Sequence, residues 1–287
     1  MKSYLSLVKF SHTIFALPFA LLGFFLGVNH LEGAFDLKVL FLVLICMITA
    51  RSAAMAFNRY LDSDIDKLNH RTADREIPAG IISPTRALLF VFMNCVVFIA
   101  ATYFINPLCL YLSPVALFVI LFYSYTKRFS FLCHLVLGLG LSLAPVGAYV
   151  AVLGEFHLIP ILYGLVVMLW VAGFDIIYAL QDEEFDKSLN LKSIPVWLGK
   201  KKALSLSFWL HMAAGLIVLC AGFLLMQEYI GMQIIHWVGA VIFIGLLFYQ
   251  HTLVRPHDLS KIDLAFFSMN GYASIAFCSL VILDFYL

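Results

Sequence analysis

Two short stretches of the chain space their carboxylate residues in the same way. Asn58, Asp62 and Asp66 follow one another at intervals of four residues, so on a continuing helix their side chains stack on one face. A second stretch repeats this interval with Tyr178, Asp182 and Asp186. Mg²⁺ takes oxygen ligands and is commonly held by one or two carboxylates plus the phosphates of a substrate. We therefore predict that the two carboxylate faces bind Mg²⁺ together with a diphosphate.

Basic residues accompany the acidic stretches and favour an anionic ligand. Arg71 and Arg75 follow the first stretch and can bind phosphate oxygens through fork-shaped, charge-assisted hydrogen bonds. Lys127 and Arg128 form a tight basic pair, which is either a clamp for diphosphate or an aromatic carboxylate, or a topological anchor beside interfacial tyrosines. The alternative for each acidic stretch is a solvated loop that caps helices. Two matched stretches with interleaved basic residues favour the metal site.

Two ionisable residues fall inside apolar segments, where a charge is costly and indicates function by default. Asp175 precedes Asp182 by seven residues and so lies about two turns deeper on the same helix face. We interpret it as the group beside the phenolic oxygen of an acceptor, and pairing with Arg51 is the alternative. Arg51 is also a candidate substrate-binding residue. None of the nine histidines is interpreted as a ligand, and the six cysteines are interpreted as free thiols.

The elements that must position these residues are long apolar segments. Of the 287 residues, 63% are hydrophobic and 12% are charged, whereas soluble domains are about 45–50% apolar and about 25% charged. A membrane-spanning helix needs about 20 mostly apolar residues. The sequence predicts one all-α integral membrane domain over residues 1–287, with nine spans at 12–30, 39–58, 85–105, 107–126, 130–153, 157–181, 203–226, 232–252 and 264–285.

The placement of charge predicts how these spans are oriented. With a cytoplasmic N-terminus, 16 of the 18 Lys and Arg residues fall on the cytoplasmic side, as the positive-inside rule requires. Both acidic stretches then face the cytoplasm, and nine spans leave the C-terminus outside. The sequence has no basic block suited to nucleic acid, which argues against a nucleic-acid partner. No obligate protein partner is indicated.

The two motifs resemble those of the UbiA superfamily of intramembrane prenyltransferases. The resemblance rests on Asn58-xxx-Asp62-xxx-Asp66 with the arginines that follow, and on Asp175-xx-Tyr178-xx-Gln181-Asp182-xxx-Asp186. It covers nearly the whole chain. It implies a nine-helix bundle around a central cavity, in the inner (cytoplasmic) membrane. It also implies Mg²⁺-dependent transfer of a polyprenyl group from its diphosphate to an aromatic ring.

The same resemblance implies a role for each matching residue. The Mg²⁺–diphosphate site would be formed by Asn58, Asp62, Asp66, Asp182 and Asp186. Arg71 and Arg75 would contact phosphate. Tyr178 would line the reacting end and stabilise an allylic cation through its π face. Asp175 would accept a proton or a hydrogen bond from the phenol of the acceptor. The implied chemistry is electrophilic substitution on an activated ring.

Three further segments resemble a narrower bacterial branch, the 4-hydroxybenzoate polyprenyltransferase-like enzymes. They lie at residues 9–19, 50–58 and 173–186. That branch includes enzymes of menaquinone synthesis through futalosine, for which the implied acceptor is 1,4-dihydroxy-6-naphthoate. Ser11-His12-Thr13-Ile14 replaces the Lys-Pro-Ile-Gly-type signature of ubiquinone-pathway enzymes, so both acceptors stay open.

Other functions fit parts of this pattern. A membrane terpene cyclase or a haem- or chlorophyll-prenylating enzyme would use the same diphosphate chemistry. A cation-coupled transporter is the alternative from another class, since intramembrane Asp and Arg also occur along ion pathways. The acidic residues crowd one surface and no pair of interrupted helices lies near the midplane, which disfavours a transporter. A non-catalytic assembly protein would not need two matched metal motifs.

Overall fold

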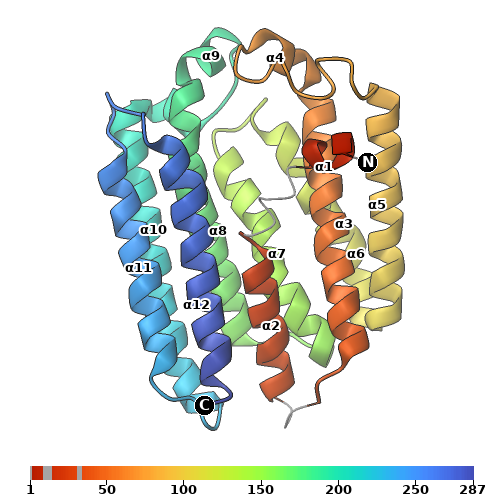
Figure 1. Ribbon diagram of the computed structural model, residues 1–287, viewed down its shortest axis with the longest axis vertical. Helices are drawn as coiled ribbons and strands as arrows, with labels where there is room; N and C mark the ends of the chain where they lie inside the picture. Colours follow the sequence, from red (N-terminus) through yellow and green to blue (C-terminus); the bar gives the residue numbers. More distant parts are fainter. Residues whose placement is uncertain (1, 9–14, 31–33) are drawn as a thin grey trace.

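The computed structural model describes residues 2–8, 15–30 and 34–287, and there the chain forms a bundle of helices along one axis (Figure 1). Short elements lie at the ends of the long helices. In chain order the elements are α1 (Lys2–Leu7), α2 (Leu17–His30), α3 (Leu37–Leu61), α4 (Ser63–Leu68), α5 (Pro84–Ile105), α6 (Pro107–Thr126), α7 (Cys133–Leu153), α8 (Leu158–Ala179), η2 (Leu180–Asp182), α9 (Glu183–Ser188), α10 (Ile194–Glu228), α11 (Ile235–Leu253), η3 (Leu264–Met269) and α12 (Asn270–Asp284).

Eight helical segments of the described chain are long and apolar enough to cross a membrane. They coincide with the eight stretches predicted from residue 39 onward, so this part of the prediction is confirmed. The first predicted stretch, 12–30, corresponds to α2, an apolar helix with 14 described residues. Residues 12–14 of that stretch lie outside the described residues.

Local sequence explains where α5 and α6 begin. Ser83 accepts a hydrogen bond from the backbone N–H of Arg86, and a proline occupies the first turn of α5. Asn106 caps α6 in the same way, accepting from the backbone N–H of Cys109 at 2.8 Å. The fixed φ of Pro107 suits the first helical position, and the extended backbone of Asn106 ends α5. The predicted division between the spans 85–105 and 107–126 is therefore confirmed.

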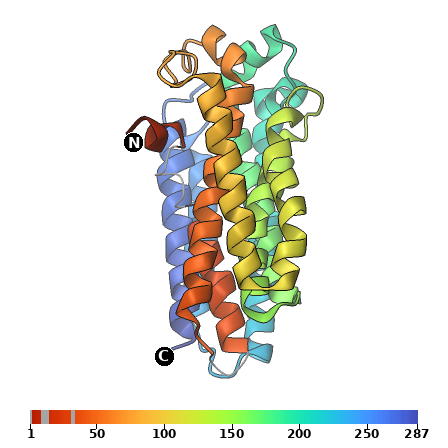
Figure 2. The same ribbon diagram turned by 90° about the vertical axis from the view of Figure 1, so that its right-hand side faces the viewer.

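Both acidic motifs cross a helix break instead of continuing one helix. At Asp62, between α3 and α4, the backbone leaves helical geometry at φ −90° and ψ 4°. At Asp182, between η2 and α9, the angles are −100° and 2°. The two aspartates thus turn the chain in nearly the same way. Helices α4 and α9 consequently lie at the same end of the bundle, here termed the motif end (Figures 1 and 2).

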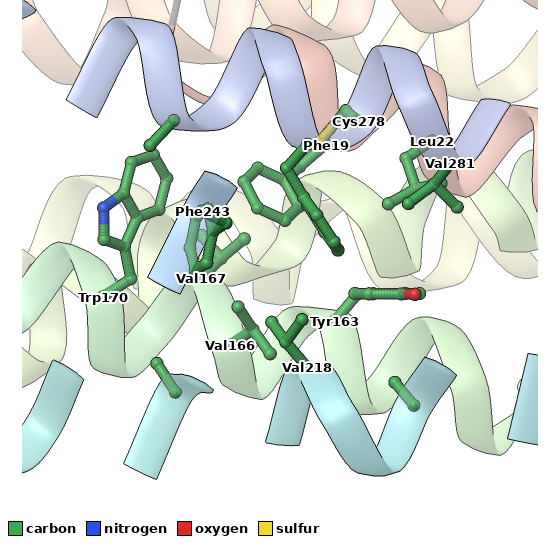
Figure 3. Packing of buried hydrophobic residues seen from close by; sticks show 14 of the residues in the cluster. Phe19, Leu22, Tyr163, Val166, Val167, Trp170, Val218, Phe243, Cys278 and Val281 are labelled. Atoms are coloured by element: carbon green, nitrogen blue, oxygen red, sulfur yellow. The ribbon is translucent and has the colours of Figure 1, made fainter. Parts of the chain in front are cut away.

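The best-packed part of the interior surrounds α8. Trp170, Phe19 and Phe243 are fully buried, and the indole ring of Trp170 lies 5.5 Å from the ring of Phe19 and 5.7 Å from that of Phe243 (Figure 3). Helices α5 and α6, in contrast, leave large apolar side chains exposed, among them Phe92, Phe104, Tyr111 and Phe118. So large an apolar surface suits contact with lipid.

Candidate active site

Asp62 lies at the centre of a group of positive charges at the motif end. Its side chain is buried, and one carboxylate oxygen accepts from Lys127 Nζ at 2.6 Å while the other accepts from Arg128 Nη2 at 3.3 Å. Asn58, one turn earlier, also donates to this carboxylate, at 3.2 Å. Burial raises the pKa of Asp62 above its ordinary value, and the charge of Lys127 opposes that rise. The predicted basic pair therefore contacts the first motif directly.

Asp66 and Arg75 form a second ion pair within the first motif. Arg75 Nη1 lies 2.8 Å from both carboxylate oxygens of Asp66. The side chain of Asp66 is buried. Thr72 fastens the intervening loop by donating to the backbone carbonyl of Asp66 at 3.1 Å. The spacing of Asp66 and Arg75 is thus set by the fold of the loop.

Arg71 joins the two motifs. Its guanidinium donates to Asp182 through Nε, at 3.2 Å, and through Nη2, and it donates to the hydroxyl of Tyr178 through Nη1 at 3.1 Å. Asn69 also donates to Asp182, at 3.3 Å. The charge of Asp182 is one cause of a raised pKa at Arg71, against the lowering effect of burial. A residue 111 positions away in the sequence thereby orients the second motif.

Lys127 connects the first motif with the loop that follows the second motif. Its ammonium forms the ion pair with Asp62, and Asp186 of the second motif lies on α9 at the same end of the bundle (Figure 1). The backbone N–H of Lys192 donates to the carbonyl of Lys127 at 2.6 Å, which fixes the two loops together. The five predicted metal residues are therefore brought to one region of the molecule.

Asp175 pairs with a histidine that the sequence interpretation had passed over. His134 Nδ1 lies 2.7 Å from a carboxylate oxygen of Asp175, and the backbone N–H of Ile194 donates to His134 Nε2 at 3.4 Å. Because Nε2 accepts from this N–H, Nδ1 is the nitrogen that donates to Asp175. His134 is almost wholly buried, whereas the Asp175 side chain keeps 24% exposure. In the described chain the partner of Asp175 is thus His134, and the alternative pairing of Asp175 with Arg51 is wrong.

A cavity of about 300 Å³ extends below the site, between α3, α5, α6 and α7. Arg51 and Tyr123 line it toward the motif end, and its walls are otherwise almost entirely apolar. Its lining residues on α6 run from Cys109 to Tyr123, a distance of about 20 Å along the helix axis. Val115, 59% exposed, belongs to the same wall, so the cavity reaches the surface of the bundle. In the described chain Arg51 Nε has no hydrogen-bond partner.

Comparison with known proteins identifies this arrangement. A family model described as the UbiA prenyltransferase family matches residues 16–272. The chain belongs to this family. It is an integral membrane prenyltransferase, and the transporter alternative is thereby wrong. Related proteins include a 4-hydroxybenzoate octaprenyltransferase of Tolumonas auensis, 27% identical over 81% of this chain and 79% of its own length, and one of Vibrio cholerae, 29% identical over 88% and 87%.

Solved structures of the UbiA family share the fold. An apo UbiA homologue from Aeropyrum pernix K1 has a TM-score of 0.83 at 33% identity, covering 95% of this chain and 98% of its own. A UbiA homologue from Archaeoglobus fulgidus bound to GPP and Mg²⁺ has a TM-score of 0.75 at 22% identity, covering 99% and 100%. The fold of this chain is therefore a fold of the UbiA family.

The motif end of this UbiA protein has the donor chemistry that Mg²⁺ prefers. All five predicted ligand residues offer oxygen atoms. Across the described residues, however, no three His, Cys, Asp or Glu side chains converge on one metal position, because the carboxylates of Asp62, Asp66 and Asp182 bind basic side chains. Mg²⁺ commonly completes its shell with substrate phosphates. The residues therefore fit a metal that binds together with a diphosphate.

Two contributors to the site escaped the sequence interpretation. His134 lies inside a predicted span, and the cost of an ionisable group there, applied to Asp175, would have singled it out as well. Asn69 gave no comparable signal, because its contact with Asp182 depends on how the loop folds back. Ser11, His12, Thr13 and Ile14, which separate this chain from the ubiquinone-pathway signature, lie outside the described residues.

Proposed function

We propose that this UbiA protein transfers a polyprenyl group from polyprenyl diphosphate to an aromatic acid in quinone biosynthesis, with Mg²⁺ as cofactor. The observation that carries the proposal is the ion pairing at the motif end, where Arg71 joins the loop after the first aspartate motif to Asp182 of the second and Lys127 binds Asp62. Such a paired acidic and basic site suits a metal–diphosphate ligand. The apolar cavity below it suits a prenyl chain. The acceptor is of the 4-hydroxybenzoate or 1,4-dihydroxy-6-naphthoate type.

The donor half of the site is formed by the residues that pair with one another in this structure. Asn58, Asp62, Asp66, Asp182 and Asp186 would hold Mg²⁺. Arg71, Arg75, Lys127 and Arg128, released from those carboxylates, would bind phosphate oxygens. When bound, the metal supplies electrostatic stabilisation of the departing diphosphate.

The acceptor half is centred on Asp175 and Tyr178, which are three residues apart on α8. Breaking the C–O bond to diphosphate develops positive charge on the allylic carbon, and the π face of Tyr178 stabilises that charge. A ring carbon of the acceptor then forms the new C–C bond, and the ring loses a proton. Asp175, held by His134, accepts the phenolic proton or hydrogen bond and so makes the ring more nucleophilic.

The cavity supports the position of the prenyl tail. Its length of about 20 Å along α6 and its apolar lining suit a long isoprenoid chain, which can enter from the bilayer through the exposed side near Val115. Arg51, unpaired through Nε in the described chain, lies at the polar end of this cavity, where the diphosphate or the acceptor carboxylate would be bound.

Two arguments bear on the identity of the acceptor, and each favours a different molecule. The relatives at 27% and 29% identity are named for 4-hydroxybenzoate. Ser11 to Ile14 depart from the signature of ubiquinone-pathway enzymes, which favours the naphthoate.

The membrane arrangement belongs to the same proposal. Residues 1–287 would form one domain with nine spans around a central cavity, of which α2 belongs to the first span. The protein would lie in the inner membrane with its N-terminus and motif end in the cytoplasm and its C-terminus outside. Its partners would be the two substrates and membrane lipid, without nucleic acid or an obligate protein partner.

The test is an assay of purified protein in lipid nanodiscs with Mg²⁺, a labelled polyprenyl diphosphate and each aromatic acid separately. Mass analysis should detect diphosphate release and a prenylated product with one acceptor. Release of diphosphate with cyclised hydrocarbon and no ring product would favour a terpene cyclase. No diphosphate release with any donor would overturn the proposal.

A further inference from the structure

A buried network of polar side chains crosses the half of the bundle opposite the cavity. Trp170 Nε1 on α8 donates to Asn270 Oδ1 on α12 at 2.7 Å, and Asn270 Nδ2 lies 3.4 Å from Gln250 Oε1 on α11. Gln250 Nε2 donates to His211 Nδ1 on α10 at 3.2 Å, and His251 Nε2 lies 2.8 Å from the same atom. Four helices thus share one hydrogen-bonded network.

The protonation of this network follows from its ends. His211 Nε2 lies 3.1 Å from the carbonyl oxygen of Trp170, which can only accept, so His211 donates from Nε2 and accepts at Nδ1. Gly173 makes this approach feasible, because a Cβ at that position would lie 2.2 Å from His211 Nε2. Polar groups inside a membrane protein are costly when left without partners, and this set satisfies its members.

Asn270 also binds the irregular helical segment that precedes it, η3. The residues before it, η3, form a π-helix, and Asn270 Nδ2 donates to the carbonyls of Ala265 at 3.0 Å and Phe266 at 2.9 Å. A π-helical turn widens the backbone and is rare except at functional sites. The side-chain amide of Asn270 therefore stabilises a local geometry that the backbone alone would not favour.

The π-helix places Phe266 against the proposed reaction centre. The ring of Phe266 stacks on Tyr178 with centroids 4.1 Å apart, and it lies edge-on to Phe174 at 5.3 Å. Tyr178 accepts a hydrogen bond from Arg71, which holds Asp182. A continuous set of contacts thus runs from Asn270 through Phe266 and Tyr178 to the second motif.

We propose that Asn270 is a positioning residue for the prenyl-transfer reaction, acting through the π-helix and Phe266 on Tyr178. This inference rests on the proposed function. By keeping the two rings stacked, Asn270 keeps the π face of Tyr178 beside the allylic carbon and keeps water away from it. Without that wall, water attacks the carbon as its C–O bond to diphosphate breaks, a new C–O bond forms, the water loses a proton, and the product is a prenyl alcohol.

The experiment measures how the prenyl group is divided between acceptor and water. Asn270→Leu keeps the branched shape of the side chain and removes every side-chain hydrogen bond, whereas Asn270→Asp keeps an acceptor for Trp170 but cannot donate to the Ala265 and Phe266 carbonyls. Since small misplacements of a reacting group cost up to about 100-fold in rate, we expect coupling to fall by about 10- to 100-fold in both variants. The ratio of prenyl alcohol to coupled product should rise by a similar factor, with KM for the prenyl diphosphate nearly unchanged.

Two comparisons separate positioning from general damage. Asn94 on α5 is half-buried and donates to the carbonyl of Phe90 in its own helix, so Asn94→Leu removes a side-chain amide elsewhere in the bundle and should leave the product ratio unchanged. Phe266→Leu removes the ring that Asn270 positions, without altering the network itself. It should raise the alcohol ratio as Asn270→Leu does, and the double variant should show no additional effect, because coupled residues are non-additive.

The outcomes have distinct meanings. A wild-type protein that releases diphosphate but prenylates no acceptor contradicts the proposed function. A wild-type protein that couples normally, with Asn270→Asp and Phe266→Leu showing the wild-type alcohol ratio, overturns the positioning role. An equal shift in Asn94→Leu also overturns it, since the effect would then be general.

Discussion

The guanidinium of Arg71 lies between the two aspartate motifs, bound to Asp182 through two nitrogens and to the hydroxyl of Tyr178 through the third. This one side chain connects the loop after α4 to the end of α8. It also places a cation over the Tyr178 ring, 5.4 Å from its centroid. A change at Arg71 should therefore disturb the second motif and Tyr178 together, and mutation can test this.

Arg71→Lys should weaken binding of the prenyl diphosphate. A lysine has one nitrogen and cannot reproduce three directed hydrogen bonds, and each charged hydrogen bond contributes about 1.5–3 kcal/mol. We expect KM for the donor to rise by about tenfold or more. Arg86→Lys, an exposed change in the first turn of α5, is the matched control. A donor KM equal to that of the control would remove Arg71 from the phosphate site.

Asp62→Ala and Asp182→Ala should each reduce turnover by a factor of at least about 100, the usual scale for losing one electrostatic contact to a transition state. Asp64→Ala is the control, because Asp64 belongs to the same stretch but its side chain is 95% exposed. Turnover is measured at saturating Mg²⁺ with folding checked by size-exclusion chromatography. Near-normal turnover in either test variant would show that its carboxylate does not serve the metal.

Mg²⁺ should bind tightly only when diphosphate is present. In the described residues the carboxylates are matched to Lys and Arg, and no protein-only metal cluster is formed. Calorimetry of the protein with Mg²⁺ alone should give weak or no heat, and addition of a non-hydrolysable prenyl diphosphate analogue should produce a clear Mg²⁺-dependent signal. Strong binding of Mg²⁺ alone would contradict this account of the site.

Much of the architecture could be predicted because membranes impose strict rules on sequence. Eight spans followed from apolar length, and Pro107 lies where two of them were predicted to separate. The break at Asp62 was not predicted, because the interval of four residues suggested a continuing helix. The residues proposed to hold Mg²⁺ share that interval. The pairing of His134 with Asp175 and of Asn270 with Trp170 could not be predicted in this way, since the partners are distant in sequence. The π-helix before Asn270 has no periodic signature that separates it from an ordinary helix.

Reporter fusions should place residues 59–84 and 182–202 in the cytoplasm and the C-terminus outside. The distribution of Lys and Arg requires the first result, and nine spans require the second. Seven of the eight span-length helices in the described chain follow this first loop, so a cytoplasmic loop puts the C-terminus outside, and α2 decides on which side the N-terminus lies. A cytoplasmic C-terminus, found with both enzymatic and fluorescent reporters, would show that one of these seven helices does not cross the membrane, whereas an N-terminus outside would show that α2 does not.

Asp175→Asn should impair coupling to the aromatic acid far more than binding of the prenyl diphosphate. Asparagine keeps the size of the side chain and can still contact His134, but it cannot act as an anionic base. We expect the coupling rate to fall by about 100-fold or more, the usual range for losing a general base, while the donor KM stays within the error of the wild type. The ion pair of Asp62 with Lys127 does not involve Asp175, so the donor half of the site should remain intact. Single-turnover measurements with saturating donor separate the two steps. Loss of Mg²⁺-dependent donor binding, with normal coupling once donor is saturating, would instead assign Asp175 to the metal site.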